Sequence, residues 1–389
     1  MSGIGADILR PMPSWTGILR RLAPLIGLAI AGVLVRYIVY VISHGPGSFG
    51  TYLDALCVWD CAWYRTIVEG GYDLMPRTRL RPGAANWAFF PLYPLGVAAL
   101  RNLLGIPTII GGLILSNTYA IAASFAARPL FEGNLRAYRL FAFAMFLGPF
   151  SMLFSTLYTE SLFVLLIILA LVALRGRRYV LAGICAGLLS ATRVTGVLMV
   201  FAILISAILD RRRDGVRWRD LPLRLLRDPD LLLGIFLAPL GLFIYMAYLQ
   251  QLTGDGFAFA HIQRAWGRGI GNPFVVLWDA IRPYDDFGPD WMITATWGIG
   301  TVVGLALALV LALRRRYAAA LFCALAILAS LSSGITSMIR FSAGLAPLGM
   351  ALSELCALRR ILCWLAYPAS FLIGLATTTG WFRSSLFVM

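Results

Sequence analysis

The sequence predicts an all-α polytopic membrane protein with about eleven membrane-spanning helices and a helical first outer loop. Of its 389 residues, 60% are hydrophobic and only 13% are charged, a balance that a water-soluble domain of this size does not need. The apolar residues form runs about as long as a bilayer is thick, and Arg-rich segments separate several of them. We expect a single integral membrane domain over residues 1–389.

The first apolar run covers residues 22–43 and predicts an uncleaved membrane anchor with a cytoplasmic N-terminus. Arg20 and Arg21 precede it, and no small-residue cleavage motif follows it. Arg36 lies inside this run, roughly 10 Å short of its outer end at 1.5 Å per residue. An arginine within the membrane is a candidate substrate-binding residue; the alternative is a side chain that reaches out to the interface.

Residues 210–228 contain seven arginines and are therefore expected in the cytoplasm. This segment sets the side of the membrane on which each other loop is expected. When the segments are assigned in both directions along the chain from residues 210–228, the sequence gives ten further spans. They are expected at residues 106–127, 138–154, 158–174, 179–190, 194–209, 231–250, 291–313, 317–331, 341–357 and 361–379. Residues 89–104 then do not cross, and we expect a helix on the outer face. The outer loops 44–105 and 251–290 are expected to cap a site there.

The composition also excludes some functions. The net charge of +15 comes from arginines, which the cytoplasmic loops of membrane proteins collect, so we expect no nucleic-acid partner. Two histidines and six scattered cysteines predict no metal or other cofactor, although the sequence leaves room for a divalent cation. Cys57 and Cys61 flank Asp60, but a spacing of four residues on one helix suits a disulfide poorly, so we expect them to be unpaired.

Asp60 is the candidate catalytic base of the first outer loop. Trp59, Trp63 and Tyr64 surround it in the sequence, so on a short helix its carboxylate would lie at the edge of an apolar bowl. A partly desolvated carboxylate can take a proton from a hydroxyl group. The alternative is an acid on a loop in solvent.

Three further candidates lie where apolar runs meet the outer face. Glu160 begins an apolar run, where it either orients a substrate hydroxyl, assists the base or stabilises a helix start. Arg193 and Arg340 are suited to bidentate contact with a lipid-linked phosphate, and the alternative is contact with lipid headgroups. Because these groups and the loop 251–290 share one side of the membrane, we expect them to form one site.

The second outer loop carries polar and aromatic side chains suited to a lid over a sugar or a prenyl phosphate, with an interfacial aromatic belt as the alternative. On a helix, Phe259, Gln263 and Trp266 would share a face. The complete expected site has Asp60 and Glu160 as catalytic residues. Its expected substrate-binding residues are Arg36, Trp59, Tyr64, Tyr158, Arg193, His261, Gln263, Arg264, Trp266 and Arg340.

Five motifs, in this order, resemble those of the PIG-V-like mannosyltransferases, bacterial relatives of the enzyme that adds the second mannose in GPI-anchor synthesis. They are WD followed by GYD and AFFPLYP, then LYTESLF, SATRVTG, FAHIQRAWGR, and an Arg-Phe pair at Arg340. The resemblance covers residues 59–347 or so. It implies a helical bundle of the GT-C glycosyltransferase superfamily and a polyprenyl-phosphate-mannose donor. Asp60, Glu160 and Arg193 match the family's motif positions.

The resemblance implies an inverting mannosyltransferase of the bacterial cytoplasmic membrane with its active site on the periplasmic face. Asp60 would deprotonate the acceptor hydroxyl, and arginines would stabilise the departing phosphate. The expected partners are the polyprenyl-phosphate-mannose donor, a lipid- or glycan-linked acceptor and membrane lipids. Two alternatives remain open: a GT-C transferase of another polyprenyl-phosphate-linked sugar, and a transporter of lipids or glycolipids.

Overall fold

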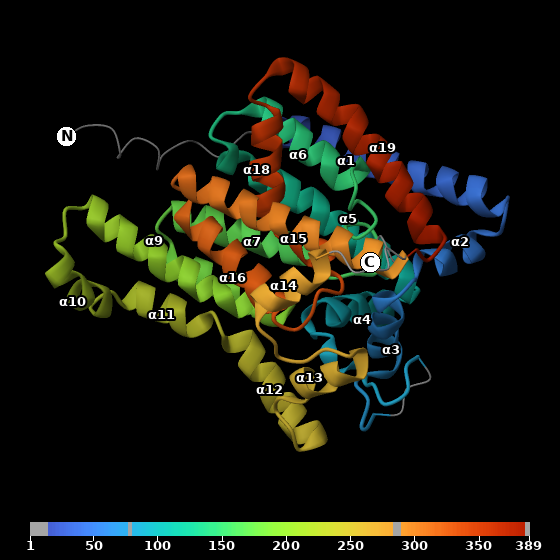
Figure 1. Ribbon diagram of the computed structural model, residues 1–389, viewed down its shortest axis with the longest axis horizontal. Coiled ribbons are helices and arrows are strands. Elements are labelled where there is room, and N and C mark those ends of the chain that lie inside the picture. The colour runs from blue at the N-terminus through green and yellow to red at the C-terminus, as the bar shows by residue number, and fades with distance from the viewer. Residues whose placement is uncertain (1–14, 77–79, 283–288, 386–389) are drawn as a thin grey trace.

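The computed structural model describes residues 15–76, 80–282 and 289–385, and within these ranges every regular element is a helix. Figure 1 shows the long helices lying side by side, with α10 (Leu221–Leu226) at one end of the bundle. Short helices gather toward the other end: α3 (Asp60–Gly70), α4 (Leu92–Leu104) and α13 (Ala258–His261).

Six candidate spans in the described part of the chain are long and apolar enough to cross a membrane, which supports a polytopic membrane protein. Their helices are α1 (Trp15–His44), α5 (Thr108–Ala127), α9 (Met199–Arg213), α11 (Pro229–Leu237) with α12 (Leu240–Thr253), α15 (Pro289–Leu313) and α19 (Arg360–Phe382). The 3-10 helices η2 (Arg128–Phe131) and η3 (Val194–Leu198) extend α5 and α9.

The other five expected spans form helices of 11 to 16 residues, which at 1.5 Å per residue are shorter than a hydrocarbon core of about 30 Å. They are α6 (Leu135–Leu147), α7 (Glu160–Arg175), α8 (Tyr179–Ser190), α16 (Tyr317–Leu331) and α18 (Ala346–Cys356). The count of eleven spans therefore remains a prediction.

The remaining elements are short and connect or cover the long helices. They are α2 (Phe49–Leu56), η1 (Asn86–Ala88), η4 (Trp218–Asp220), η5 (Ile262–Trp266), α14 (Pro273–Ile281) and α17 (Met338–Ala343). The segment 89–104, expected on the outer face, contains α4 (Leu92–Leu104), which packs against α3 and α5. At 13 residues α4 is not among the candidate spans.

The helix α7 is the centre of the fold and places Glu160. Its sequence is apolar on every face, which is typical of a helix enclosed by others, and it packs against α5 and α8. Most of its side chains are buried, including Phe163 and Ile167. Because α7 is fixed on all sides, its first residue, Glu160, has a fixed position in the bundle.

Glycines allow α8 to pack closely against the helix pair α11 and α12. A Cβ atom on Gly183 would collide with the backbone of Gly234, and one on Gly241 would collide with the backbone of Gly187. Such close backbone approach is what small residues provide between membrane helices. This close packing fixes the position of α8 and of the segment after it, which carries Arg193.

Candidate functional site

A cavity of about 810 Å³ lies where α3, η3, α13, η5, α16 and α17 meet. Its lining combines carboxylate, guanidinium, hydroxyl and aromatic groups from stretches far apart in the chain. Eight of the twelve predicted site residues line it: Asp60, Tyr64, Arg193, His261, Gln263, Arg264, Trp266 and Arg340. A cavity of this size with convergent polar groups is the usual form of a small-molecule site.

Four charged side chains form a chain of ion pairs at the cavity, three of them in its lining and Glu160 behind it. Arg340 Nη2 lies 2.6 Å from Asp60 Oδ2, and Arg340 Nε lies 3.4 Å from Glu160 Oε1. Glu160 also pairs with Arg193 through Oε1. Burial alone would lower the pKa of the Arg340 guanidinium, but the charges of Asp60 and Glu160 raise its pKa above the ordinary value. Arg340 therefore stays cationic and joins the two carboxylates.

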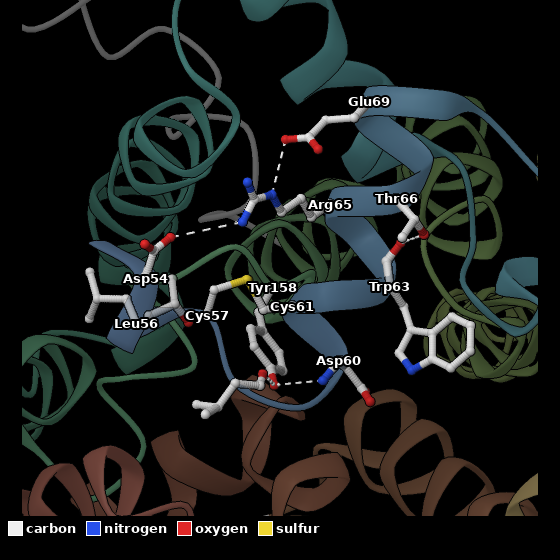
Figure 2. Close-up of a disulfide and its surroundings, with 12 residues drawn as sticks. Asp54, Leu56, Cys57, Asp60, Cys61, Trp63, Arg65, Thr66, Glu69 and Tyr158 are labelled. Atoms are coloured by element: carbon white, nitrogen blue, oxygen red, sulfur yellow. Dashed lines mark hydrogen bonds and ion pairs between the residues drawn. A yellow bond between two sulfur atoms is a disulfide. The ribbon is translucent and has the colours of Figure 1, made fainter. Parts of the chain in front are cut away.

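Asp60 is the first residue of α3, and its backbone is held in place by Tyr158. The backbone N–H of Asp60 donates to the Tyr158 hydroxyl at 3.1 Å, and that hydroxyl donates to the carbonyl of Val58 at 2.8 Å. In Figure 2 the Asp60 carboxylate points away from the Tyr158 contact, toward the cavity that it lines. Its side chain is 16% exposed, so Asp60 is not an acid in open solvent.

The expectation that Cys57 and Cys61 are unpaired is wrong, because the two residues form a disulfide (Figure 2). The prediction assumed one continuous helix through both residues. Instead α2 ends at Leu56 and α3 begins at Asp60. The break brings the two Cα atoms within 5.1 Å, which is within the normal range for a disulfide.

Glu160 lies behind the cavity wall. Its side chain is completely buried, and Oε2 has no hydrogen-bond partner among the described residues. The neighbouring Thr159 hydroxyl accepts a hydrogen bond from Arg193 Nε at 3.2 Å and lies 3.4 Å from the Tyr64 hydroxyl. Glu160 is not part of the cavity lining, so this arrangement suits a residue that orients Arg193 and Arg340 better than one that touches substrate.

Trp59 and Tyr158 also lie outside the cavity lining, although the sequence predicted both as substrate-binding residues. The Trp59 ring packs edge-on against Trp381 with 5.0 Å between centroids, and Tyr158 packs against the same indole at 5.4 Å. Both side chains therefore support the chain at Asp60 without lining the cavity.

Arg36 lies apart from the site. It is buried in α1 and donates to the carbonyl of Phe146 at 3.3 Å, next to a separate cavity of about 10 Å³. Phe146 is the penultimate residue of α6, whose last carbonyls lack partners within the helix. The Arg36 guanidinium therefore binds a helix end, and the predicted substrate-binding role has no support in this position.

Residues 257–270, part of the predicted second outer loop, contribute to the cavity lining, and aromatic contacts hold them there. The Trp266 ring packs against Trp63 at 5.3 Å and Phe89 at 6.1 Å between centroids. At the exposed edge, His261 Nδ1 lies 2.6 Å from Asp255 Oδ2, and this hydrogen bond lowers the pKa of Asp255. The loop thus forms a wall of the site built on aromatic packing.

Arg268 belongs to the cavity lining but was not among the predicted substrate-binding residues. Its guanidinium lies 5.5 Å from the Phe341 ring centroid, and those of Arg193 and Arg340 lie 5.5 and 5.2 Å from the same centroid. Among the described residues Arg268 has no carboxylate partner, and its guanidinium donates to the Thr336 carbonyl at 3.4 Å. Burial and the nearby Arg340 charge lower its pKa. Gly267 has a φ of +67° and turns the chain after η5, so the helical face expected for Phe259, Gln263 and Trp266 does not extend to Arg268.

The described residues contain no group of three or more His, Cys, Asp or Glu side chains placed to hold a metal ion. No protein-family model and no curated protein matches the chain. The resemblance to the PIG-V-like mannosyltransferases therefore rests on the five motifs alone.

Proposed function

We propose that this chain is an integral membrane glycosyltransferase that moves mannose from a polyprenyl-phosphate-mannose donor to an acceptor hydroxyl outside the cytoplasm. The observation that carries the proposal is the Asp60 carboxylate, which lines a cavity of about 810 Å³ within 2.6 Å of the Arg340 guanidinium. A carboxylate oriented by a cation beside a large pocket is suited to general-base chemistry.

In this reaction Asp60 takes the proton of the acceptor hydroxyl. The acceptor oxygen forms a bond to the anomeric carbon of mannose as the bond from that carbon to the donor phosphate oxygen breaks. Attack in line with the leaving group converts a β-linked donor into an α-mannoside. The electron pair of the broken bond stays with the polyprenyl phosphate, which gains negative charge.

Three arginines favour an anionic leaving group. Arg193, Arg268 and Arg340 converge on Phe341, and their nearest acids are Asp60 and Glu160. Three guanidinium groups near two carboxylates leave an excess of positive charge in a partly buried setting. A guanidinium there binds phosphate oxygens strongly, because charge-assisted hydrogen bonds gain strength when water is excluded. Arg268 is the arginine of the three without a carboxylate partner among the described residues, and we assign it the most direct phosphate contact.

The apolar part of the lining suits a prenyl chain. Val197, Leu198, Ala326 and Ile327 line the same cavity as the charged groups. On another part of the wall, Trp266 and Gln263 offer an aromatic face and an amide, the groups that commonly orient a sugar. A lipid-linked sugar would use both kinds of surface at once.

Two features support a site on the extracytoplasmic side. The disulfide between Cys57 and Cys61 adjoins Asp60, and disulfides persist in oxidising compartments outside the cytoplasm. The Arg-rich segment that follows α9 lies near α10, at the end of the bundle opposite α3 (Figure 1), and basic segments favour the cytoplasmic side. In a bacterial cytoplasmic membrane this orientation makes the site periplasmic.

The test is transfer by the purified protein in proteoliposomes with a short-chain polyprenyl-phosphate-mannose carrying radiolabelled mannose. The proposal expects release of unlabelled polyprenyl phosphate together with labelled mannoside in the presence of total membrane lipid as acceptor. The same assay is run with polyprenyl-phosphate-linked glucose and aminoarabinose of the same chain length. Transfer from one of these donors in place of the mannose donor would identify a transferase of another sugar. Movement of intact labelled lipid across the vesicle membrane without cleavage would identify a transporter instead and contradict the proposal.

A further inference from the structure

The disulfide closes a small covalent ring that contains the backbone of Asp60. Cys57 follows the last residue of α2, and Cys61 is the second residue of α3. Only Val58, Trp59 and Asp60 lie between them. Figure 2 shows the disulfide and the Tyr158 hydroxyl close to the start of α3, where the backbone N–H of Asp60 donates to that hydroxyl. The candidate base is therefore held in a ring rather than on an open loop.

The ring holds a backbone conformation that its sequence does not favour. Trp59 has φ +51° and ψ −114°, in a region that residues with a side chain rarely adopt. This turn directs α3 away from α2 and makes Asp60 the first helical residue. Such a conformation persists only where the surroundings enforce it.

Contacts from distant parts of the chain enforce the same turn. Tyr158 bonds to the backbone on both sides of Trp59, at Val58 O and Asp60 N. Trp381 packs against the Trp59 ring and donates from Nε1 to the carbonyl of Leu56 at 3.3 Å. The cavity lining contains none of the residues that hold this turn: Cys57, Cys61, Trp59, Tyr158 and Trp381. They are placed to position Asp60 without contact to a substrate.

We propose that the disulfide between Cys57 and Cys61 is a positioning element for Asp60, so that turnover depends on the redox state of this link. The inference rests on the proposed function. Reduction by a dithiol breaks the sulfur–sulfur bond, because two electrons and two protons from the reductant give two thiols and the reductant becomes a cyclic disulfide. The turn at Trp59 then loses its covalent constraint, and the Asp60 carboxylate samples positions away from the acceptor hydroxyl.

The effect is expected on turnover rather than on global stability. A disulfide stabilises a fold mainly by limiting the unfolded chain, and this limit grows with the length of the loop that it closes. The loop here has only three intervening residues, so this effect is smaller than for a long loop. Misplacement of a reacting group by about 1 Å, in contrast, lowers a rate by on the order of 100-fold.

The first experiment maps the link in protein isolated from membranes without reductant. Trypsin releases residues 37–65, which contain Cys57 and Cys61 as their only cysteines. The inference expects this peptide to resist alkylation and to gain two hydrogens on reduction. Two alkylated thiols before reduction would overturn it.

The second experiment compares kcat and donor KM for wild type and Cys57→Ser/Cys61→Ser. The inference expects kcat to fall between about 10- and 100-fold, while KM and the thermal unfolding midpoint stay close to wild type. In an Asp60→Asn background the same pair of substitutions should lower the residual rate no further, because the group to be positioned is absent. A wild-type kcat in Cys57→Ser/Cys61→Ser overturns the inference and leaves the proposed function intact.

A matched control isolates the link from the other cysteines. Cys185, Cys323, Cys356 and Cys363 are free and lie outside the cavity lining. A variant with these four replaced by serine should still lose turnover on treatment with dithiothreitol and regain it on reoxidation. Loss of this response would assign the effect to the free thiols and contradict the inference. Absence of any transfer by oxidised wild type would contradict both the proposed function and this inference.

Discussion

The Nη2 atom of Arg340 lies 2.6 Å from the Oδ2 atom of Asp60, although the two residues are 280 positions apart in the chain. Arg340 also lies 3.4 Å from the buried Glu160 through Nε. One cation thus ties the candidate base on α3 to the start of the central helix α7. This pairing sets both the direction of the Asp60 carboxylate and the position of a positive charge beside the proposed leaving group.

Arg340→Gln should lower transfer strongly. Glutamine is neutral and too short to reach both Asp60 and Glu160, so the variant removes a phosphate contact and leaves Glu160 buried with less compensation. We expect kcat/KM to fall by on the order of 100- to 1,000-fold, the usual loss when one stabilising donor is removed from a developing charge. Arg340→Lys keeps the charge but loses the fork of donors, and should recover only part of the rate. Both are measured by initial rates at several donor concentrations. Near-wild-type rates for Arg340→Gln would exclude the proposed role.

Arg268→Gln should weaken binding of the phosphate group in particular. The guanidinium has no carboxylate partner among the described residues, so its loss leaves no acid newly unpaired and the fold should tolerate it. We expect the Kd for farnesyl phosphate to rise about 10-fold or more, equivalent to one charge-assisted contact. The Kd for farnesol, which lacks the phosphate, should stay unchanged. Tryptophan fluorescence of protein in nanodiscs measures both.

The matched control is Arg101→Gln, because Arg101 is exposed on α4 and outside the cavity lining. It removes the same charge without touching the proposed site. Equal weakening in the two variants would indicate a general electrostatic effect and contradict a specific contact at Arg268.

A stability test lies away from the site. Glu354 on α18 is 3% exposed and pairs with Arg314 at 2.6 Å and Arg316 at 2.8 Å. Glu354→Gln should lower the free energy of unfolding by about 2 kcal/mol, since it removes the buried carboxylate charge that pairs with two partly exposed guanidinium groups. Turnover of the folded fraction should remain at the wild-type level. The unfolding midpoint and kcat are measured on the same sample. A large change in kcat with an unchanged midpoint would show that the two regions are coupled.

Much of the helical fold could be predicted from apolar runs, because a run long enough to span a bilayer predicts a helix whatever its neighbours do. Breaks within runs were harder to predict. The span expected at 231–250 divides into α11 and α12 near Pro239, and the one at 341–357 divides around Gly344. These ends depend on packing between helices, which hydropathy does not contain.

The candidate site was predictable where polar residues interrupt apolar runs. Arg193 and Arg340 stand out for this reason, Asp60 stands out through its aromatic neighbours in the first outer loop, and all three line the cavity. Residues that depend on a local turn were missed: Arg268 follows the turn at Gly267, and the disulfide depends on the turn at Trp59. Arg36 does not line the cavity, because its guanidinium donates to the carbonyl of Phe146 near the end of α6.

The central claim is that the Asp60 carboxylate takes the acceptor proton, and the most direct measurement is kcat of Asp60→Asn with the polyprenyl-phosphate-mannose donor. Asn keeps the size of the side chain but cannot accept the proton, so kcat should fall by about 100- to 10,000-fold. Asp54→Asn is the matched control, because Asp54 is an exposed acid on the neighbouring α2 with 75% of its side chain accessible, and it should keep the wild-type rate. Turnover by Asp60→Asn at the wild-type rate would contradict the account.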